Sequence, residues 1–79
     1  MNITVRYLGM LAEKVGKNSE ELKISETETV AQVRSDLVAK YAVIAGVTFK
    51  VAVNNQMKSE DFVIPNDAEV ALLPPFSGG

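Results

Sequence analysis

The sequence contains no cysteine, no histidine and no tryptophan, and these absences restrict its chemistry. Without cysteine the chain has no thiol nucleophile and forms no disulfide bond, which fits a reducing compartment. Without histidine it has no side chain that exchanges protons near neutral pH. The usual zinc ligands are also missing, and the acidic residues do not follow the spacing of a calcium loop. We therefore expect no bound metal or cofactor and no catalytic side chain of the common kinds.

Long apolar runs and a strong excess of positive charge are absent as well. No stretch approaches the ~20 apolar residues of a membrane span, and the first residues lack the apolar core of a secretory signal. The net charge of −2 offers no basic surface for a nucleic acid backbone. With 79 residues, of which 47% are hydrophobic and 23% charged, the sequence is typical of one globular domain. We expect a cytoplasmic protein that binds neither nucleic acid nor membrane.

Alternation of polar and apolar residues predicts several strands with one buried face. Four stretches show this pattern: residues 2–8, 19–25, 47–53 and 68–73. The turn residues Asn54 and Asn55 follow the third stretch, and a short return strand is expected directly after them. The first two strands are close enough in sequence to pair as a hairpin.

One helix is predicted between the second and third strands. Apolar residues recur at spacings of three and four over residues 30–41, which places them on one helical face. Thr29 and Gln32 match the spacing of a capping box at its start. The order strand, strand, helix, strand, short strand, strand predicts an α+β fold of the β-grasp type, with a mixed sheet of four to five strands covered by one main helix.

The sheet face opposite this helix carries apolar residues too. If the alternation is right, Leu8, Ala52, Ala71 and Leu73 lie on that face, which would be wet in an isolated domain. Two interpretations stay open: scattered surface apolar residues, which are common, or a docking patch beside the last strand.

The sequence ends on "LLPPFSGG", and the proline pair divides it. Pro74 and Pro75 cannot donate backbone hydrogen bonds to a sheet, so the last strand must end before them. Adjacent prolines favour a stiff extended conformation, so residues 74–79 are predicted to project from a domain formed by residues 1–73. Six such residues reach at most ~20 Å, enough to enter a pocket of another protein.

Gly78 and Gly79 give the tail its chemical interest. Neither has a Cβ, so they fit a narrow channel and leave the terminal carboxyl carbon open to attack. An ionised carboxylate resists nucleophiles and must first be activated. The chain has no phosphate-binding loop of the G-x-x-x-x-G-K type, so ATP-dependent activation has to come from a separate enzyme. Taken alone, "SGG" is also compatible with an inert flexible end.

The chain resembles the MoaD-type sulfur carriers, the small subunits of molybdopterin synthase, which are ubiquitin-like β-grasp proteins. The resemblance covers essentially all residues and is carried by "VRYLGMLAEKVG", "TVAQVRSDL", "VAVNNQ" and, most specifically, "EVALLPPFSGG". Related carriers for thiamine synthesis also end on two glycines but tend to lack the proline pair. Two departures are Leu8-Gly9, where the family often has Phe-Ala, and Phe76, where a smaller aliphatic residue is common.

The resemblance implies a reaction at Gly79. An E1-like enzyme would use ATP to adenylate its carboxylate, sulfur would displace AMP, and the thiocarboxylate would donate sulfur to a cyclic pterin precursor to build the molybdopterin dithiolene. The partner would be the large synthase subunit, in a heterotetramer of two small and two large subunits, and it would supply the catalytic side chains. The residues expected to bind partners are Gly78, Ser77, Phe76, Pro75, Pro74, Leu73, Ala71 and Leu8.

Three alternatives remain open at this point. A carrier for thiamine or another pathway would share every argument about the tail. A protein modifier would use the same adenylate, captured by a lysine amine. A plain interaction module would carry an inert tail.

Overall fold

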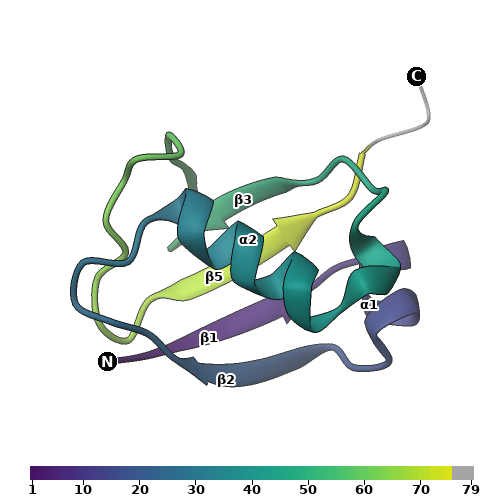
Figure 1. Ribbon diagram of the computed structural model, residues 1–79, viewed down its shortest axis with the longest axis horizontal. Coiled ribbons are helices and arrows are strands. Elements are labelled where there is room, and N and C mark those ends of the chain that lie inside the picture. The colour runs from purple at the N-terminus through teal and green to yellow at the C-terminus, as the bar shows by residue number, and fades with distance from the viewer. Residues whose placement is uncertain (76–79) are drawn as a thin grey trace.

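The computed structural model describes residues 1–75, which form a five-stranded mixed sheet with one main helix (Figure 1). The elements in chain order are β1 (Asn2–Tyr7), α1 (Met10–Val15), β2 (Ser19–Lys23), α2 (Val30–Lys40), the 3-10 helix η1 (Ala42–Ile44), β3 (Lys50–Val53), β4 (Gln56–Met57) and β5 (Glu69–Leu73). The strand order is β2-β1-β5-β3-β4. β5 runs parallel to β1, and all other neighbouring strands are antiparallel. The last strand in sequence therefore lies at the centre of the sheet.

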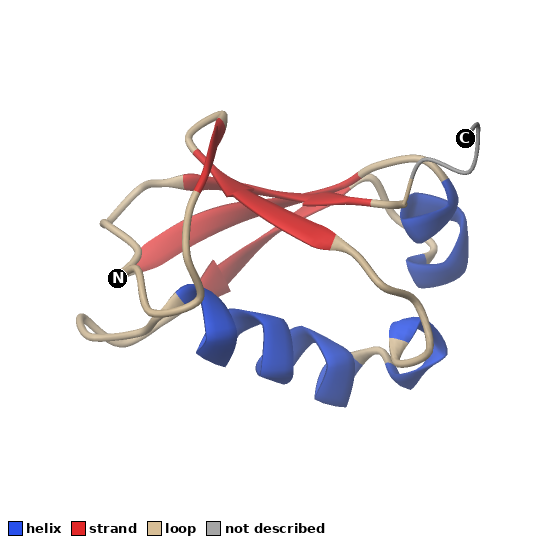
Figure 2. Cartoon of the chain, turned by 90° about the horizontal axis from the view of Figure 1, so that it is seen from above, coloured by secondary structure: helices blue, strands red, loops and turns tan. Residues whose placement is uncertain are grey.

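Helix α2 lies across one face of the sheet (Figure 2). It begins with the predicted capping box: Gln32 N–H donates to Thr29 Oγ1 at 3.3 Å, and Thr29 N–H donates to Gln32 Oε1 at 2.8 Å. Its buried residues are Val30, Val33 and Leu37, at the spacing that predicted the helix. Together with the inward-facing residues of the sheet they form a single apolar core. The inward residues of the three central strands are Ile3, Val5, Tyr7, Val51, Val53, Val70 and Leu72.

Strand β3 begins later than the alternation predicts. The pattern starts at residue 47, whereas β3 starts at Lys50, which pairs with Leu73. Beyond that pair the neighbouring chain continues as Pro74, which has no N–H to extend the ladder. Phe49 is nevertheless buried, so the inward side of the pattern continues past the last hydrogen-bonded pair.

The connection between β4 and β5 is irregular chain that the sequence pattern did not reveal. Residues 58–68 cross from β4 to β5 and bond to the start of α2, where Val30 N–H donates to the Phe62 carbonyl at 3.0 Å. Ile64 from this crossing is fully buried, and its N–H donates to the Glu28 carbonyl at 2.9 Å. This segment contributes to the core without being a regular element.

Among residues 1–75, no helix is both long and apolar enough to cross a membrane.

Candidate functional site

The candidate site is the end of β5, which is held on both sides up to Leu72 and by β3 alone at Leu73. Leu72 pairs with Tyr7 of β1 on one side and with Val51 of β3 on the other. Its carbonyl also accepts a hydrogen bond of 3.3 Å from Leu8 N–H. Because a central strand cannot shift without breaking two ladders, the point where the chain leaves the sheet is fixed.

Pro74 marks the exit from the sheet and packs against the turn between β1 and α1. An added Cβ on Gly9 of that turn would lie 3.2 Å from Pro74 Cγ, which is tighter than ordinary van der Waals contact. Gly9 has φ 54° and ψ −130°, a conformation that side chains other than hydrogen rarely allow. The first residue of the tail therefore sits directly on a glycine.

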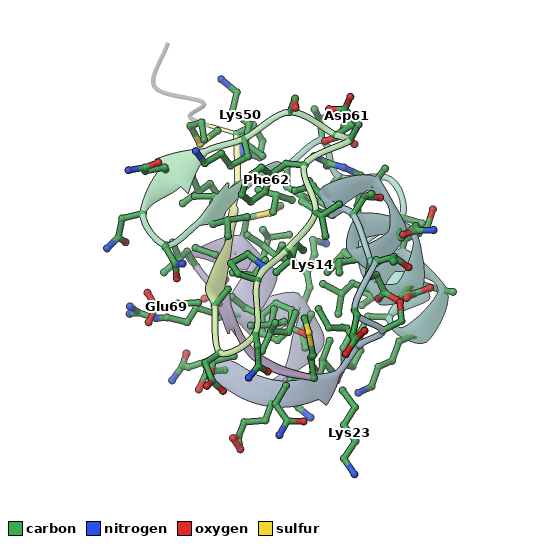
Figure 3. The ribbon with its side chains drawn as sticks, turned by 90° about the vertical axis from the view of Figure 1, so that its left-hand side faces the viewer. Lys14, Lys23, Lys50, Asp61, Phe62 and Glu69 are labelled. Atoms are coloured by element: carbon green, nitrogen blue, oxygen red, sulfur yellow. The ribbon has the colours of Figure 1, made fainter. Side chains whose placement is uncertain are left out.

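A hollow of about 320 Å³ lies on the other side of the tail base, toward β3. Its lining residues are Thr48, Lys50, Leu73, Pro74 and Pro75. The exposed side chain of Lys50 lies at the rim, close to where the chain leaves β5 (Figure 3). The site thus combines an apolar floor of leucine and proline with one cation.

The sheet face away from α2 continues this apolar surface, and no helix of residues 1–75 covers it (Figure 2). Ala71 and Leu73 of β5 are half-buried there. The expectation that Ala52 would be wet is wrong, since it is only 7% exposed. Its short side chain is flanked across the strands by Ala71 and Met57, which shield it from solvent. Met57 itself is 55% exposed.

The structure brings together five of the residues expected to bind partners: Leu8, Ala71, Leu73, Pro74 and Pro75 all lie at or beside the end of β5. The other four residues of the predicted site, Phe76, Ser77, Gly78 and Gly79, lie outside the described residues.

Sequence reasoning missed three residues at the tail base: Gly9, Thr48 and Lys50. The pairing of Lys50 with Leu73 would have followed from the register of β3 against β5, which alternation alone does not supply. Gly9 was noted only as part of the Leu8-Gly9 departure from the family, because its positive φ depends on the turn that it enters.

A polar cluster holds the same end of the sheet from the core side. Both the Tyr7 and the Tyr41 hydroxyls donate to Glu20 Oε2, at 2.5 and 2.6 Å, and Lys40 Nζ donates to Oε1 at 3.0 Å. Burial alone would raise the pKa of Glu20, but these hydrogen bonds from Tyr41, Tyr7 and Lys40 lower it to about 2. Burial, reinforced by the Glu20 carboxylate, raises the pKa of Tyr7 far above its usual value. The Tyr7 hydroxyl therefore stays protonated, and the cluster ties β1, β2 and the end of α2 together.

A mixed sheet in this order, with the last strand at its centre and one main helix across it, defines a ubiquitin-like β-grasp protein. The model of the ThiS family matches residues 5–79, which is nearly the whole chain. The chain belongs to the ThiS family, within the ubiquitin-like sulfur carriers of the ThiS and MoaD type. The resemblance found in the sequence is thus confirmed at the level of the family.

Solved structures show the same fold. SAMP1 from Haloferax volcanii is 21% identical over 100% of both chains, with a TM-score of 0.88. The putative molybdopterin converting factor subunit 1 from Pyrococcus furiosus is 18% identical over 95% of this chain and 98% of its own, with a TM-score of 0.89. A chain in the complex of subunits 1 and 2 of the molybdopterin-converting factor from Helicobacter pylori is 19% identical over 100% of both chains, with a TM-score of 0.69. These likenesses confirm the predicted ubiquitin-like β-grasp fold.

Proposed function

We propose that this protein is the sulfur carrier subunit of a molybdopterin synthase, with Gly79 as the residue that carries sulfur. The observation that supports the proposal most directly is the position of β5. A central strand, bonded on both sides to its final residues, leads without a linker into a proline pair and then into "FSGG". A rigid base of this kind suits a tail whose end must reach a reactive centre in another protein.

In the proposed reaction, a carboxylate oxygen of Gly79 attacks the α-phosphorus of ATP and releases pyrophosphate. The acyl-adenylate has a good leaving group, so a sulfur nucleophile from a separate donor displaces AMP and leaves a thiocarboxylate. An E1-like enzyme supplies the ATP site, since the chain has no phosphate-binding motif of its own. The thiocarboxylate sulfur then bonds to a cyclic pterin precursor, and water hydrolyses the resulting thioester, which leaves sulfur on the pterin and regenerates the Gly79 carboxylate for the next cycle.

The proposed partner in the transfer step is a large synthase subunit, in a heterotetramer of two small and two large subunits. The pairing of subunits 1 and 2 in the Helicobacter pylori complex supports a protein partner of this type. On this chain, the surface offered to that partner is Leu8, Ala71, Leu73, Pro74 and Pro75 together with the tail. The large subunit provides the catalytic side chains.

Intact-mass measurement of the protein purified from its native host tests the carrier chemistry. A thiocarboxylate makes the chain heavier by the difference between one sulfur and one oxygen atom, and tandem fragmentation locates that difference. We expect it on Gly79. A population that carries only the free carboxylate during active cofactor synthesis would contradict the proposal.

Reconstitution separates the possible pathways. The thiocarboxylated protein and a large synthase subunit are incubated with the cyclic pterin precursor, and molybdopterin is detected after oxidation to a fluorescent derivative. Sulfur transfer to a thiazole precursor instead would assign the carrier to thiamine synthesis. Isolation of the chain joined through Gly79 to lysine side chains would indicate a protein modifier.

A further inference from the structure

We propose that Gly9 is a positioning residue for the tail: the absence of a side chain there seats Pro74 against the turn between β1 and α1 and so sets the direction in which the chain leaves β5. The inference rests on the proposed function, because direction matters only when the tail must enter the active site of another protein.

The conformation of Gly9 is the first element of the argument. Leu11 N–H donates to the Leu8 carbonyl at 3.1 Å, and Gly9 between them has φ 54° and ψ −130°. These are the angles of the first central position in a type II′ turn, where glycine is strongly favoured. The turn carries the chain from β1 into α1 directly beside the end of β5.

The contact with Pro74 is the second element. A Cβ on Gly9 would lie 3.2 Å from Pro74 Cγ, and the proline ring can move this atom only by a change of ring pucker. Relief beyond that change must come from the backbone on either side of the contact. Gly16, the other described glycine with a positive φ, has no atom within 4 Å of an added Cβ, so this restriction is specific to Gly9.

The surroundings of Pro74 determine the direction in which a side chain at Gly9 would displace it. β1 and β3 flank β5 on opposite sides, so the Gly9 turn lies on the β1 side of the tail base. The hollow lined by Thr48, Lys50 and Leu73 lies on the β3 side. A side chain at Gly9 pushes Pro74 away from the turn and toward this hollow, which Pro74 itself helps to line. The change in direction is then passed along a proline pair that favours a stiff extended conformation.

Small displacements of Pro74 matter because the reactive carboxylate of Gly79 lies several residues further along the chain. Misplacement of a reacting group by about 1 Å is enough to lower a rate by about a hundredfold. A shift of a few tenths of an ångström at Pro74 changes the direction in which the proline pair leaves the sheet, and the resulting displacement grows with distance from Pro74. Gly9 thus acts on the reaction through Pro74, without touching the reacting atoms.

A double-mutant cycle on Gly9 and Pro74 tests the inference. The substrate is the full chain, and the measured quantity is kcat/KM for ATP-dependent pyrophosphate release by the E1-like enzyme. We expect Gly9→Ala to lower kcat/KM by about tenfold in the wild-type background but by less than about threefold in the Pro74→Ala background, which lacks the Cγ atom. Equal losses in both backgrounds, or no loss for Gly9→Ala, would overturn it.

Gly16→Ala is the matched control for backbone strain. It places alanine at φ 88° in open space, so we expect a lower Tm with wild-type kcat/KM. A loss of kcat/KM for Gly16→Ala that follows its loss of Tm would attribute the Gly9 effect to instability and overturn the positioning role.

Nuclear magnetic resonance tests the contact between Gly9 and Pro74 independently of enzyme activity. It also tests the inference if Gly9→Ala fails to fold. In the wild-type protein we expect a nuclear Overhauser contact between Gly9 Hα and Pro74 Hγ, and its absence would overturn the inference. If the wild-type chain shows this contact but releases no pyrophosphate with the activating enzyme of its host, the proposed function fails while the seat of Pro74 stands.

Discussion

Tyr7 and Glu20 are joined by a hydrogen bond of 2.5 Å that links the end of β1 to the start of β2. Tyr7 pairs through its backbone with Leu72, so this bond stabilises the strand on which the end of β5 depends. Tyr41 donates to the same carboxylate oxygen at 2.6 Å, and its ring meets that of Tyr7 edge to face, with centroids 5.9 Å apart. The hydrogen bonds that stabilise this part of the fold and the candidate functional site therefore lie at the same end of the sheet.

The first prediction concerns acid stability. The pKa of Glu20 is lowered from 4.5 to about 2, so its contribution to folding is fully present above pH 4.5 and is lost as the pH falls toward 2. A shift of this size corresponds to at most roughly 3 kcal/mol. We expect Glu20→Gln to be less stable than wild type at pH 7 and to lose less stability between pH 5 and 2.5. Urea unfolding across this pH range measures the difference. Glu21→Gln, at the exposed neighbouring position, controls for net charge and should keep the wild-type pH slope.

The second prediction concerns Glu28, whose effect on stability changes with pH in the opposite direction. Burial, followed by the neighbouring Asp36 carboxylate, raises the pKa of Glu28. A carboxyl group with a raised pKa binds more protons in the folded state, so it destabilises the fold as the pH rises through its titration. We expect Glu28→Gln to raise Tm slightly at pH 7 and to lose this advantage at pH 3. Glu26→Gln, an exposed substitution of the same charge, should not show the gain; equal gains for both would assign the effect to net charge.

A third prediction concerns Arg34, which connects α2 to two irregular segments. Its Nε and Nη2 each lie 3.0 Å from the Glu60 carboxylate, while Nη1 donates to the Phe49 carbonyl at 2.6 Å. The guanidinium carbon also lies 4.8 Å from the centre of the Phe49 ring. We expect Arg34→Ala to lower the free energy of unfolding by about 2 kcal/mol, because the charged hydrogen bond and the ring contact are both lost.

Glu60→Gln separates the contribution of the ion pair between Arg34 and Glu60 from that of the contacts between Arg34 and Phe49. The Glu60 side chain is 56% exposed, so its ion pair should contribute less than about 1 kcal/mol. Urea unfolding of Arg34→Ala, Arg34→Lys and Glu60→Gln tests the ranking. Lysine lacks the planar fork and should recover little. If Glu60→Gln costs as much as Arg34→Ala, the carbonyl and the ring of Phe49 contribute nothing measurable.

Strands β1, β2, β3 and β5 and helix α2 could be predicted from the sequence because each of them has an apolar period of its own. The alternation of Ile3, Val5 and Tyr7 and the helical spacing of Val30, Val33 and Leu37 are local patterns, and the structure buries every one of these residues. The order of elements then left few ways to cover a single sheet with a single helix. The family resemblance was carried most specifically by the last segment, "EVALLPPFSGG".

The details of the tail base could not be predicted, because they depend on contacts between distant segments. The contact of Gly9 with Pro74 requires the parallel register of β1 and β5, which no local pattern encodes. The burial of Ala52 depends likewise on which residues flank it across two strands. The late start of β3 reflects a missing N–H in its neighbour, so it too is a property of the pair and not of either strand.

The fourth prediction concerns the end of the tail. Within residues 1–75, every residue of the apolar core lies at or before Leu72, so we expect deletion of Gly79 to leave Tm within about 1 °C of wild type. The same deletion should abolish adenylation, because the carboxylate no longer reaches the activating site. Addition of one residue after Gly79 should have the same effect. Normal sulfur transfer by the extended variant, with its extra residue confirmed by mass, would contradict the carrier role.

Gly78→Val examines the narrowness of the channel that the tail must enter. A branched side chain there should impair adenylation or transfer by steric exclusion, again without a change in Tm. The two steps are assayed separately, and wild-type rates in both would show that glycine is not required for passage.

The fifth prediction concerns the docking surface formed by Leu8, Ala71 and Leu73. Leu73 lies directly across from Lys50 on the uncovered face, so a new charge at this position does not enter the core. An aspartate would be partly neutralised by Lys50, whereas a lysine would place two like charges opposite each other and leave both without compensation in a desolvated interface. Leu73→Lys should therefore weaken association with the large subunit more than Leu73→Asp does, and we expect a loss of at least tenfold.

Phe76→Ala extends the same experiment into the tail, where loss of an aromatic anchor should cost ~2 kcal/mol, or about thirtyfold in Kd. Titration calorimetry against the large subunit measures each variant after circular dichroism has shown that it is folded. Val63→Lys is the matched control, because Val63 is 48% exposed but lies on the crossing segment that pairs with Thr29, away from the end of β5. Wild-type affinity for Leu73→Lys and Phe76→Ala would show that binding does not depend on this surface. An equal loss of affinity for Val63→Lys would show the same, because a substitution outside the interface should weaken binding less than one inside it.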